Sequence, residues 1–186
     1  MKKRISFFAG ASLCCASLLL CGCEGSIPFT AQTPDFDRAY CTSAQIKFGG
    51  MEASADITRN GKDDWEFSFT EPEQLMGITM TLADGELTAS LGELSVTAEL
   101  NSEYSTIPAL IAQGLDALPN ITAENISETD GILTMHTQLD GKNLTVTADK
   151  TGSLISMKVP YHQLAVYFED MENTVITEET YAVTTG

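Results

Sequence analysis

Basic residues are scarce in this chain of 186 residues. Lysine and arginine together number 10, against 26 aspartate and glutamate residues, which gives a formal net charge of -16. Three of these basic residues lie at positions 2–4, so the rest of the chain is more acidic still. The phosphates of nucleic acids repel such a polyanion, which excludes nucleic acid as a partner. Attraction of the protein's own charge to an anionic bilayer is disfavoured for the same reason.

The sequence also lacks the residue patterns of enzymes. Its two histidines, His136 and His162, are far apart and have no metal-ligand spacing to Cys, Asp or Glu. There is no G-x-S-x-G motif, no glycine-rich phosphate loop and no EF-hand loop. The many carboxylates are scattered, and solubility explains them. We therefore predict that the protein is not an enzyme, with no catalytic residue, metal site or cofactor.

The beginning of the chain has the pattern of a signal peptide. Positions 1–4 are Met-Lys-Lys-Arg, and positions 5–20 carry no charge and are mostly apolar or small. This stretch is shorter than the roughly 20 apolar residues that a membrane-spanning helix needs. Four of the five cysteines lie within the first 23 residues. We interpret the remaining one, Cys41, as a small buried hydrophobic residue rather than as a nucleophile.

The stretch ends in Leu20-Cys21-Gly22-Cys23, which resembles the lipobox of bacterial lipoproteins. The resemblance implies that residues 1–22 are removed and that Cys23 carries a diacylglycerol thioether. Cys21 is a poorer candidate, because Leu20 would then stand beside the scissile bond, where the peptidase needs a small side chain. Two acyl chains suffice for stable anchoring. The predicted location is therefore extracytoplasmic, with the membrane as partner through Cys23.

A tether and one domain follow the lipobox. Residues 24–37 contain two prolines and small polar residues without periodicity. Fully extended, they reach about 45 Å. We assign residues 23–37 to the lipidated cysteine with its tether and residues 38–186 to the domain.

Apolar and polar residues alternate with period two along most of the domain, which predicts strands. Turn dipeptides that accept positive φ separate several of them: Asn60-Gly61, Asp84-Gly85 and Asp140-Gly141. Successive strands at such short spacing pair as an antiparallel meander. The predicted strands are 45–48, 65–69, 78–82, 94–100, 133–139, 144–147 and 155–159, with a further one at 175–183.

One segment, residues 105–118, has helical periodicity instead. Its apolar residues recur at spacings of three and four: Ile107, Leu110, Ile111, Leu115 and Leu118. Gly114 is its weak point as a helix. The fold class predicted is mainly β (α+β): a curved antiparallel half-barrel sheet with one central helix covering its concave face.

The segment Phe69-Thr-Glu71-Pro72-Glu-Gln-Leu75-Met-Gly77-Ile78 resembles a strand connection of the lipoprotein-carrier (Lol-type) half-barrel family. In several members of that family the apolar concave face holds acyl chains. The resemblance implies a cavity between sheet and helix. The side chains expected to line it are Trp65, Phe67, Phe69, Ile78, Met80, Leu110, Ile111 and Leu115. The aromatic ones are equally consistent with ordinary core.

Two functional hypotheses stay open. The first is a membrane-anchored module that binds a hydrophobic ligand, such as a lipid or an acyl chain, in the half-barrel cavity. The second is a cell-envelope scaffold or sensor that docks another envelope protein and has no small ligand. A cavity of several hundred Å³ lined by the alternating apolar residues favours the first hypothesis, and a filled core favours the second.

Overall fold

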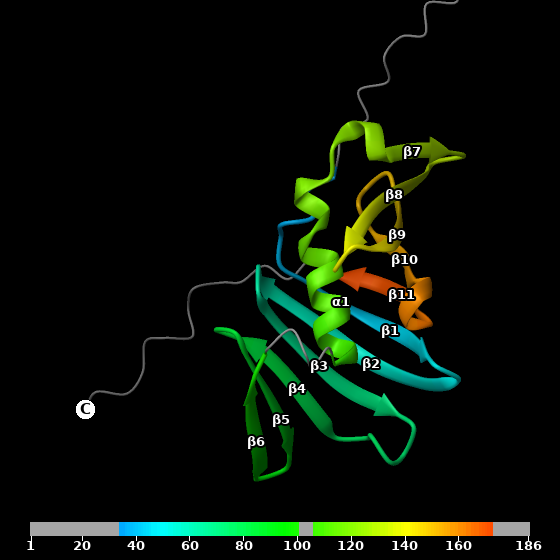
Figure 1. Ribbon diagram of the computed structural model, residues 1–186. Helices are drawn as coiled ribbons and strands as arrows, with labels where there is room; N and C mark the ends of the chain where they lie inside the picture. Colours follow the sequence, from blue (N-terminus) through cyan, green and yellow to red (C-terminus); the bar gives the residue numbers. More distant parts are fainter. Residues whose placement is uncertain (1–33, 101–105, 173–186) are drawn as a thin grey trace, which may run out of the picture. The chain divides into compact units, whose positions relative to one another are not determined.

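A computed structural model describes residues 34–100 and 106–172 (Figure 1). The predicted signal peptide (1–22), Cys23 and the predicted strand 175–183 lie outside these residues. The strands are β1 (Tyr40–Phe48), β2 (Met51–Gly61), β3 (Asp64–Glu71), β4 (Ile78–Ala83), β5 (Glu86–Leu91), β6 (Leu94–Glu99), β7 (Ile126–Thr129), β8 (Ile132–Leu139), β9 (Lys142–Asp149), β10 (Leu154–Val159) and β11 (Leu164–Glu172). The helical segments are α1 (Ile107–Asp116) and the short 3-10 turns η1 (Leu118–Asn120), η2 (Ala123–Asn125) and η3 (Pro160–His162).

All strands belong to one open antiparallel sheet, in the order β6-β5-β4-β3-β2-β1-β11-β10-β9-β8-β7. Every neighbouring pair is a hairpin except β1 with β11, which join the two ends of the domain in the middle of the sheet. Between the two halves the chain crosses the concave face as α1 (Figure 1). The predicted fold class, a curved half-barrel sheet with one central helix, is confirmed.

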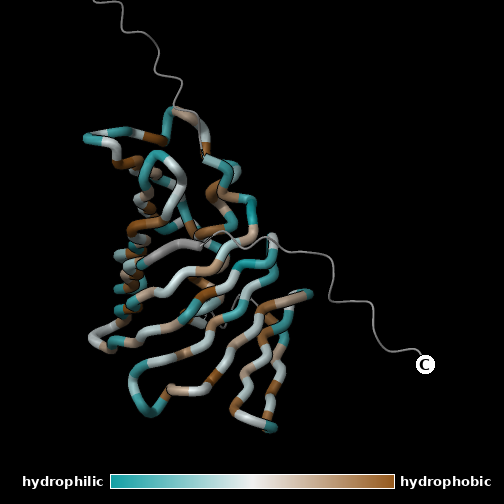
Figure 2. The backbone as a smooth tube through the Cα atoms, turned by 180° about the vertical axis from the view of Figure 1, so that it is seen from behind, coloured by the Kyte–Doolittle hydropathy of each residue, from teal (hydrophilic) through white to brown (hydrophobic). Residues whose placement is uncertain are grey.

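Hydropathy alternates along the strands (Figure 2), and the inward positions form the core. Beneath α1 the sheet contributes Ile57, Trp65 and Phe67, all fully buried. The rings of Trp65 and Phe67 stack with centroids 6.3 Å apart. Four residues of the predicted stripe complete this core, Leu110, Ile111 and Leu115 on α1 and Leu118 directly after it, whereas Ile107 is only partly buried.

Thr106 caps the start of α1, where its side chain accepts a hydrogen bond from the Ala109 amide at 3.3 Å. Pro108 lies in the first turn, where its missing N–H costs nothing. Pro119 follows the end of the helix, inside η1. No helix in the described part of the chain is long and apolar enough to cross a membrane.

Gly114 is a point of close contact between α1 and the sheet. A Cβ at this position would lie 2.3 Å from the Met157 methyl and 3.2 Å from a Leu144 methyl. Both neighbours are fully buried, so a side chain at position 114 would force them to shift within the core. Glycine therefore lets α1 approach β9 and β10 closely.

Gly114→Leu is expected to lower the free energy of unfolding by about 3 kcal/mol or more, because overpacking alone costs about 1–3 kcal/mol for smaller insertions. Urea denaturation followed by circular dichroism measures this. Gln113→Leu, on the exposed side of the same helix, is the matched control and should change stability by less than about 0.5 kcal/mol. Equal stabilities of the two variants would contradict the close approach.

The packed domain begins earlier in the sequence than predicted. Phe36 is only 4% exposed, and Asp37 accepts a hydrogen bond from the buried Arg59 at 2.8 Å. Pro34 lies against the turn between β9 and β10, beside Gly152. The boundary between tether and domain therefore lies before Phe36 rather than after Asp37.

Candidate functional site: an apolar groove at the start of the helix

An apolar groove of about 580 Å³ opens between the start of α1 and the sheet. We call it the α1 groove. The β1–β2 hairpin, the end of β3, the β3–β4 turn, Met80 of β4 and the first turn of α1 form its walls. The lining residues are Ile46, Phe48, Met51, Glu52, Ala53, Phe69, Pro72, Leu75, Met80, Thr106, Ile107 and Pro108.

The strand register explains why these walls are apolar. Ile46 pairs with Ala53 and Phe48 with Met51 across the β1–β2 hairpin, so inward positions of both strands stand side by side. Small Ala53 leaves space where a larger residue would fill the groove. Among the lining side chains only Glu52 is charged, and its carboxylate is engaged by Lys47 at 3.0 Å.

A hydrogen-bonded turn closes the groove between β3 and β4. The amides of Leu75 and Met76 both donate to the Pro72 carbonyl, at 2.8 and 3.1 Å. Gly77 follows with φ +83° and donates to the Phe69 carbonyl at 3.1 Å. The connection between β3 and β4 is this single isolated turn. It places the Leu75 side chain in the groove wall.

The apolar face of the sheet continues beyond α1 across β4, β5 and β6. One row of paired residues runs Phe67, Met80, Ala89, Val96. Exposure rises along this row from 0% at Phe67 to 73% at Val96. The helix thus covers the centre of the sheet and leaves the concave face of β5 and β6 open.

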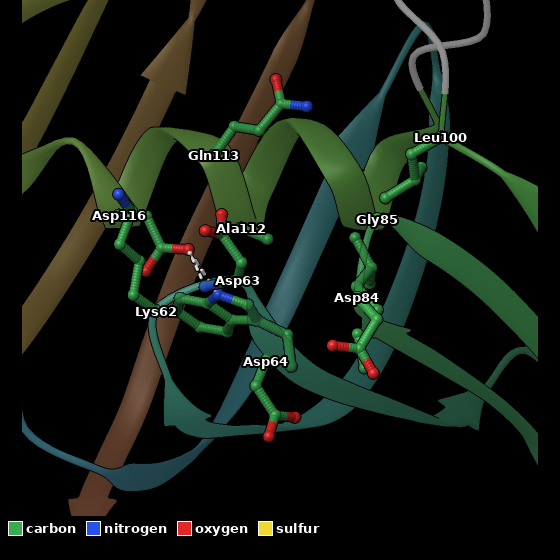
Figure 3. Close-up of a pocket in the computed structure, with 12 residues that line it drawn as sticks. Lys62, Asp63, Asp64, Asp84, Gly85, Leu100, Ala112, Gln113 and Asp116 are labelled. Atoms are coloured by element: carbon green, nitrogen blue, oxygen red, sulfur yellow. Dashed lines mark hydrogen bonds between the residues drawn. The ribbon is translucent and has the colours of Figure 1, made fainter.

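A second cavity, of about 560 Å³, lies near the other end of α1 and is polar (Figure 3). Asp116 points from α1 toward the β2–β3 turn in this view. Its carboxylate accepts hydrogen bonds from Trp65 Nε1 at 2.9 Å, the Asp63 amide at 3.0 Å and Arg59 Nε at 3.2 Å. The three donors belong to β2, to β3 and to the turn between them, so this cluster fastens α1 to the sheet.

Arg59 is the charged centre of that cluster and is only 1% exposed. Burial disfavours its guanidinium ion, but the hydrogen bond to Asp37 and the charge of Asp116 outweigh this and raise the pKa of Arg59 above its ordinary value. The guanidinium also lies over the Trp65 ring, 5.6 Å from its centroid. Burial similarly raises the pKa of the neighbouring Tyr40 well above its usual range.

The residues that the sequence proposed as cavity lining separate into three groups. Phe69 and Met80 line the α1 groove. Ile78 is partly buried beside them and packs on the core. The remaining ones are enclosed between helix and sheet, where Trp65 also borders the polar cavity: Trp65, Phe67, Leu110, Ile111 and Leu115. The sequence did not point to Ala53 or Leu75, because a small residue and a turn residue carry no cavity signal.

The remaining candidate groups form no site. His136 is exposed on β8 and His162 is partly exposed in η3. Cys41 is partly exposed, with its Sγ 3.4 Å from the Thr58 Oγ1, so its interpretation as a buried residue is wrong. Within the described residues, no group of three or more His, Cys, Asp or Glu side chains is arranged to hold a metal ion.

No protein-family model and no curated protein matches the sequence. Solved structures do match. An uncharacterized conserved protein from Thermus thermophilus is 10% identical with a TM-score of 0.49, and 76% of this chain covers 82% of that one. A LolA superfamily protein from Nitrosomonas europaea is 9% identical with a TM-score of 0.42 (79% of this chain, 91% of that one). An outer membrane lipoprotein-sorting protein domain from Vibrio parahaemolyticus is 9% identical with a TM-score of 0.44 (76% and 88%).

The second of these structures is named as a LolA superfamily protein, the family that the segment 69–78 resembles. With identities of 10% or less and TM-scores below 0.5, none of the three assigns a ligand or an activity to this chain. Its function has to follow from its own residues.

Proposed function

We propose that the protein is a lipid-anchored extracytoplasmic lipoprotein that binds a hydrophobic ligand, a lipid or an acyl chain, in the α1 groove. The observation that carries the proposal is the groove itself, a space of about 580 Å³ with apolar walls between helix and sheet. Its volume is within the range of about 300–1,000 Å³ that small-molecule sites occupy. The open concave face of β5 and β6 continues the apolar surface for a longer or branched chain.

The geometry of the groove supports an apolar ligand. The groove walls offer almost no hydrogen-bonding groups, because their single carboxylate is already paired with Lys47. A polar ligand would lose its water without compensation there. An acyl chain loses nothing and gains about 0.8 kcal/mol for each methylene that it buries. Catalysis has no support among the described residues, so binding is the proposed activity.

The test is a titration with an acyl probe, 11-(dansylamino)undecanoic acid, displaced by palmitate. Trp65 is a poor reporter because it is enclosed in the core. The mature protein is expected to give a saturable rise in dansyl emission. Ala53→Phe should fill the groove and weaken binding by about tenfold or more, which corresponds to about 1.4 kcal/mol.

Ala165→Phe is the matched control. Ala165 lies on β11, between Lys47 and Lys158 on the outer face of the sheet, and is partly exposed like Ala53. The Ala165→Phe variant should bind the probe as the unmodified protein does. Equal loss in both variants would indicate a general disturbance. Absence of saturable binding, with no lipid copurifying, would favour the second hypothesis, a scaffold that docks an envelope protein.

A further inference from the structure

Large hydrophobic side chains are exposed along one edge of the sheet, meaning the side on which the ends of the strands are joined by turns and not an outermost strand. Met51 is 62% exposed, Met76 58%, Leu91 53% and Leu94 76%. They lie in or beside three alternate turns of the meander, β1–β2, β3–β4 and β5–β6. We call these four residues the apolar rim. A soluble surface scatters such residues singly, and their gathering on one edge marks an interaction surface.

Antiparallel pairing places the three turns together. Successive hairpins alternate between the two edges, so every second turn returns to the same one (Figure 1). The β2–β3 and β4–β5 turns lie on the opposite edge. Pro34, where the described domain begins, is also on that opposite edge, because it lies against the β9–β10 turn.

The apolar rim adjoins the mouth of the α1 groove. Met51 belongs to both, and Leu75, which lines the groove, immediately precedes Met76. Leu91 pairs with Ile78 and lies 3.7 Å from where a Cβ of Gly77 would be. An apolar surface in contact with the rim would therefore also meet the entrance of the groove.

The charges near the rim select among lipid surfaces. Glu73 and Glu93 stand within the same turns, while the nearby Lys47 is neutralised by Glu52. This edge is therefore acidic, and an anionic lipid surface repels it. A zwitterionic bilayer presents no such repulsion and accepts apolar side chains at the boundary of headgroups and acyl chains.

The tether is long enough for the rim to reach the bilayer. Strands of eight residues, such as β3, span about 26 Å from one edge of the sheet to the other. Cys23 and Pro34 are eleven positions apart in the sequence, and fully extended this stretch reaches about 36–40 Å. A chain anchored at Cys23 can thus pass the full height of the domain and still present the opposite edge to the membrane.

We propose that the apolar rim docks on the zwitterionic surface of the bilayer that holds Cys23, so that the groove opens directly into lipid. This inference rests on the proposed function and extends it: the ligand would exchange between bilayer and groove without crossing water. The partner is the lipid surface itself and not a protein.

The experiment uses mature protein reconstituted in phosphatidylcholine vesicles, with and without acyl-chain-brominated phosphatidylcholine as a quencher. Leu94→Trp places an indole on the rim, and Ile132→Trp places one at a partly exposed site on the opposite edge. Trp65 is a common background. Because rim docking buries a side chain about 5–10 Å into the boundary region, we expect brominated lipid to lower the added emission of Leu94→Trp about twofold or more, and that of Ile132→Trp not at all.

Equal quenching of both variants, or none in either, overturns the proposal; no quenching in pure lipid would point to a protein partner. Replacing part of the phosphatidylcholine by phosphatidylglycerol at low salt should weaken the quenching, and an increase would also overturn it. A Met76→Glu/Leu94→Glu variant should keep its equilibrium affinity for the dansyl probe and exchange it with vesicles about tenfold more slowly. If the unmodified protein does not bind the dansyl probe, the proposed function is refuted. The quenching experiment tests the docking of the apolar rim separately.

Discussion

Asp116→Ala is expected to lower the free energy of unfolding by about 3–5 kcal/mol, the usual cost of removing one partner of a buried ion pair. The substitution leaves Arg59 charged and 1% exposed, with only the Asp37 carboxylate and the Arg38 carbonyl as partners. It also leaves the Trp65 indole N–H and the Asp63 amide without the acceptor that they share. An unpaired buried donor adds its own desolvation cost.

Urea denaturation followed by circular dichroism measures this loss. Lys47→Ala is the control, because the Lys47–Glu52 pair has the same charges but both side chains are well exposed; it should cost less than about 1 kcal/mol. The double variant Arg59→Met/Asp116→Leu should be more stable than Asp116→Ala, since no charge is left buried. Similar small losses for Asp116→Ala and Lys47→Ala would mean that the cluster does not hold α1.

Cys23→Ala is expected to abolish lipid anchoring, because Cys21, the other cysteine of the lipobox, has Leu20 beside it where the peptidase needs a small side chain. The protein should then appear in the soluble extracytoplasmic fraction or persist as an unprocessed precursor. Cell fractionation and intact mass measure both outcomes. The unmodified protein should have lost residues 1–22 and gained the mass of the diacylglycerol group.

Cys21→Ala is the matched control, since it leaves Leu20, Gly22 and Cys23 in place. This variant should be processed and anchored as before. A Cys23→Ala protein that is processed and membrane-bound like the unmodified one would refute the lipoprotein assignment and, with it, the tether argument for the apolar rim.

The strands with clean alternation could be predicted from the sequence, and those interrupted by special residues could not. In β2 the inward positions include Ala53, Ala55 and the buried Arg59. Because these positions lack large apolar side chains, the segment resembles a loop. The predicted turn Asn60-Gly61 is therefore wrong: both residues end β2, and the turn is Lys62-Asp63 with φ +59° at Asp63. The bond from the Asp63 amide to Asp116 is made across 53 positions, which no local pattern reveals.

Irregularities of the sheet also escaped the sequence pattern. The alternation of Ile155, Met157 and Val159 predicted three inward residues, yet Ile155 is 38% exposed and Leu154 is buried instead. A register shift between Leu154 and Ser156 accounts for this. Strands β5 and β7 were missed as well, since short or weakly apolar runs resemble connections, and the longer, apolar β11 was also missed.

The candidate site was predictable in kind but not in position. The periodicity of α1 correctly indicated a helix over the apolar face, and the aromatic stripe drew attention to its centre. The centre is filled, because Leu110, Ile111 and Leu115 pack onto Trp65 and Phe67. The open space lies where small Ala53 and the end of the helix leave the sheet uncovered, which depends on how far α1 extends.

The pairing of β1 with β11 has a consequence for how the chain acquires its structure. Each half of the sheet is a series of local hairpins, which form on a microsecond timescale of about 1–10 μs each. The central seam joins residues more than a hundred positions apart, such as Phe48 and Leu164, and such distant pairing slows folding. A chain that emerges N-terminus first therefore presents one edge of β1 without its partner until β11 has emerged. This interval is when the protein is most exposed to proteases and to mispairing with other chains.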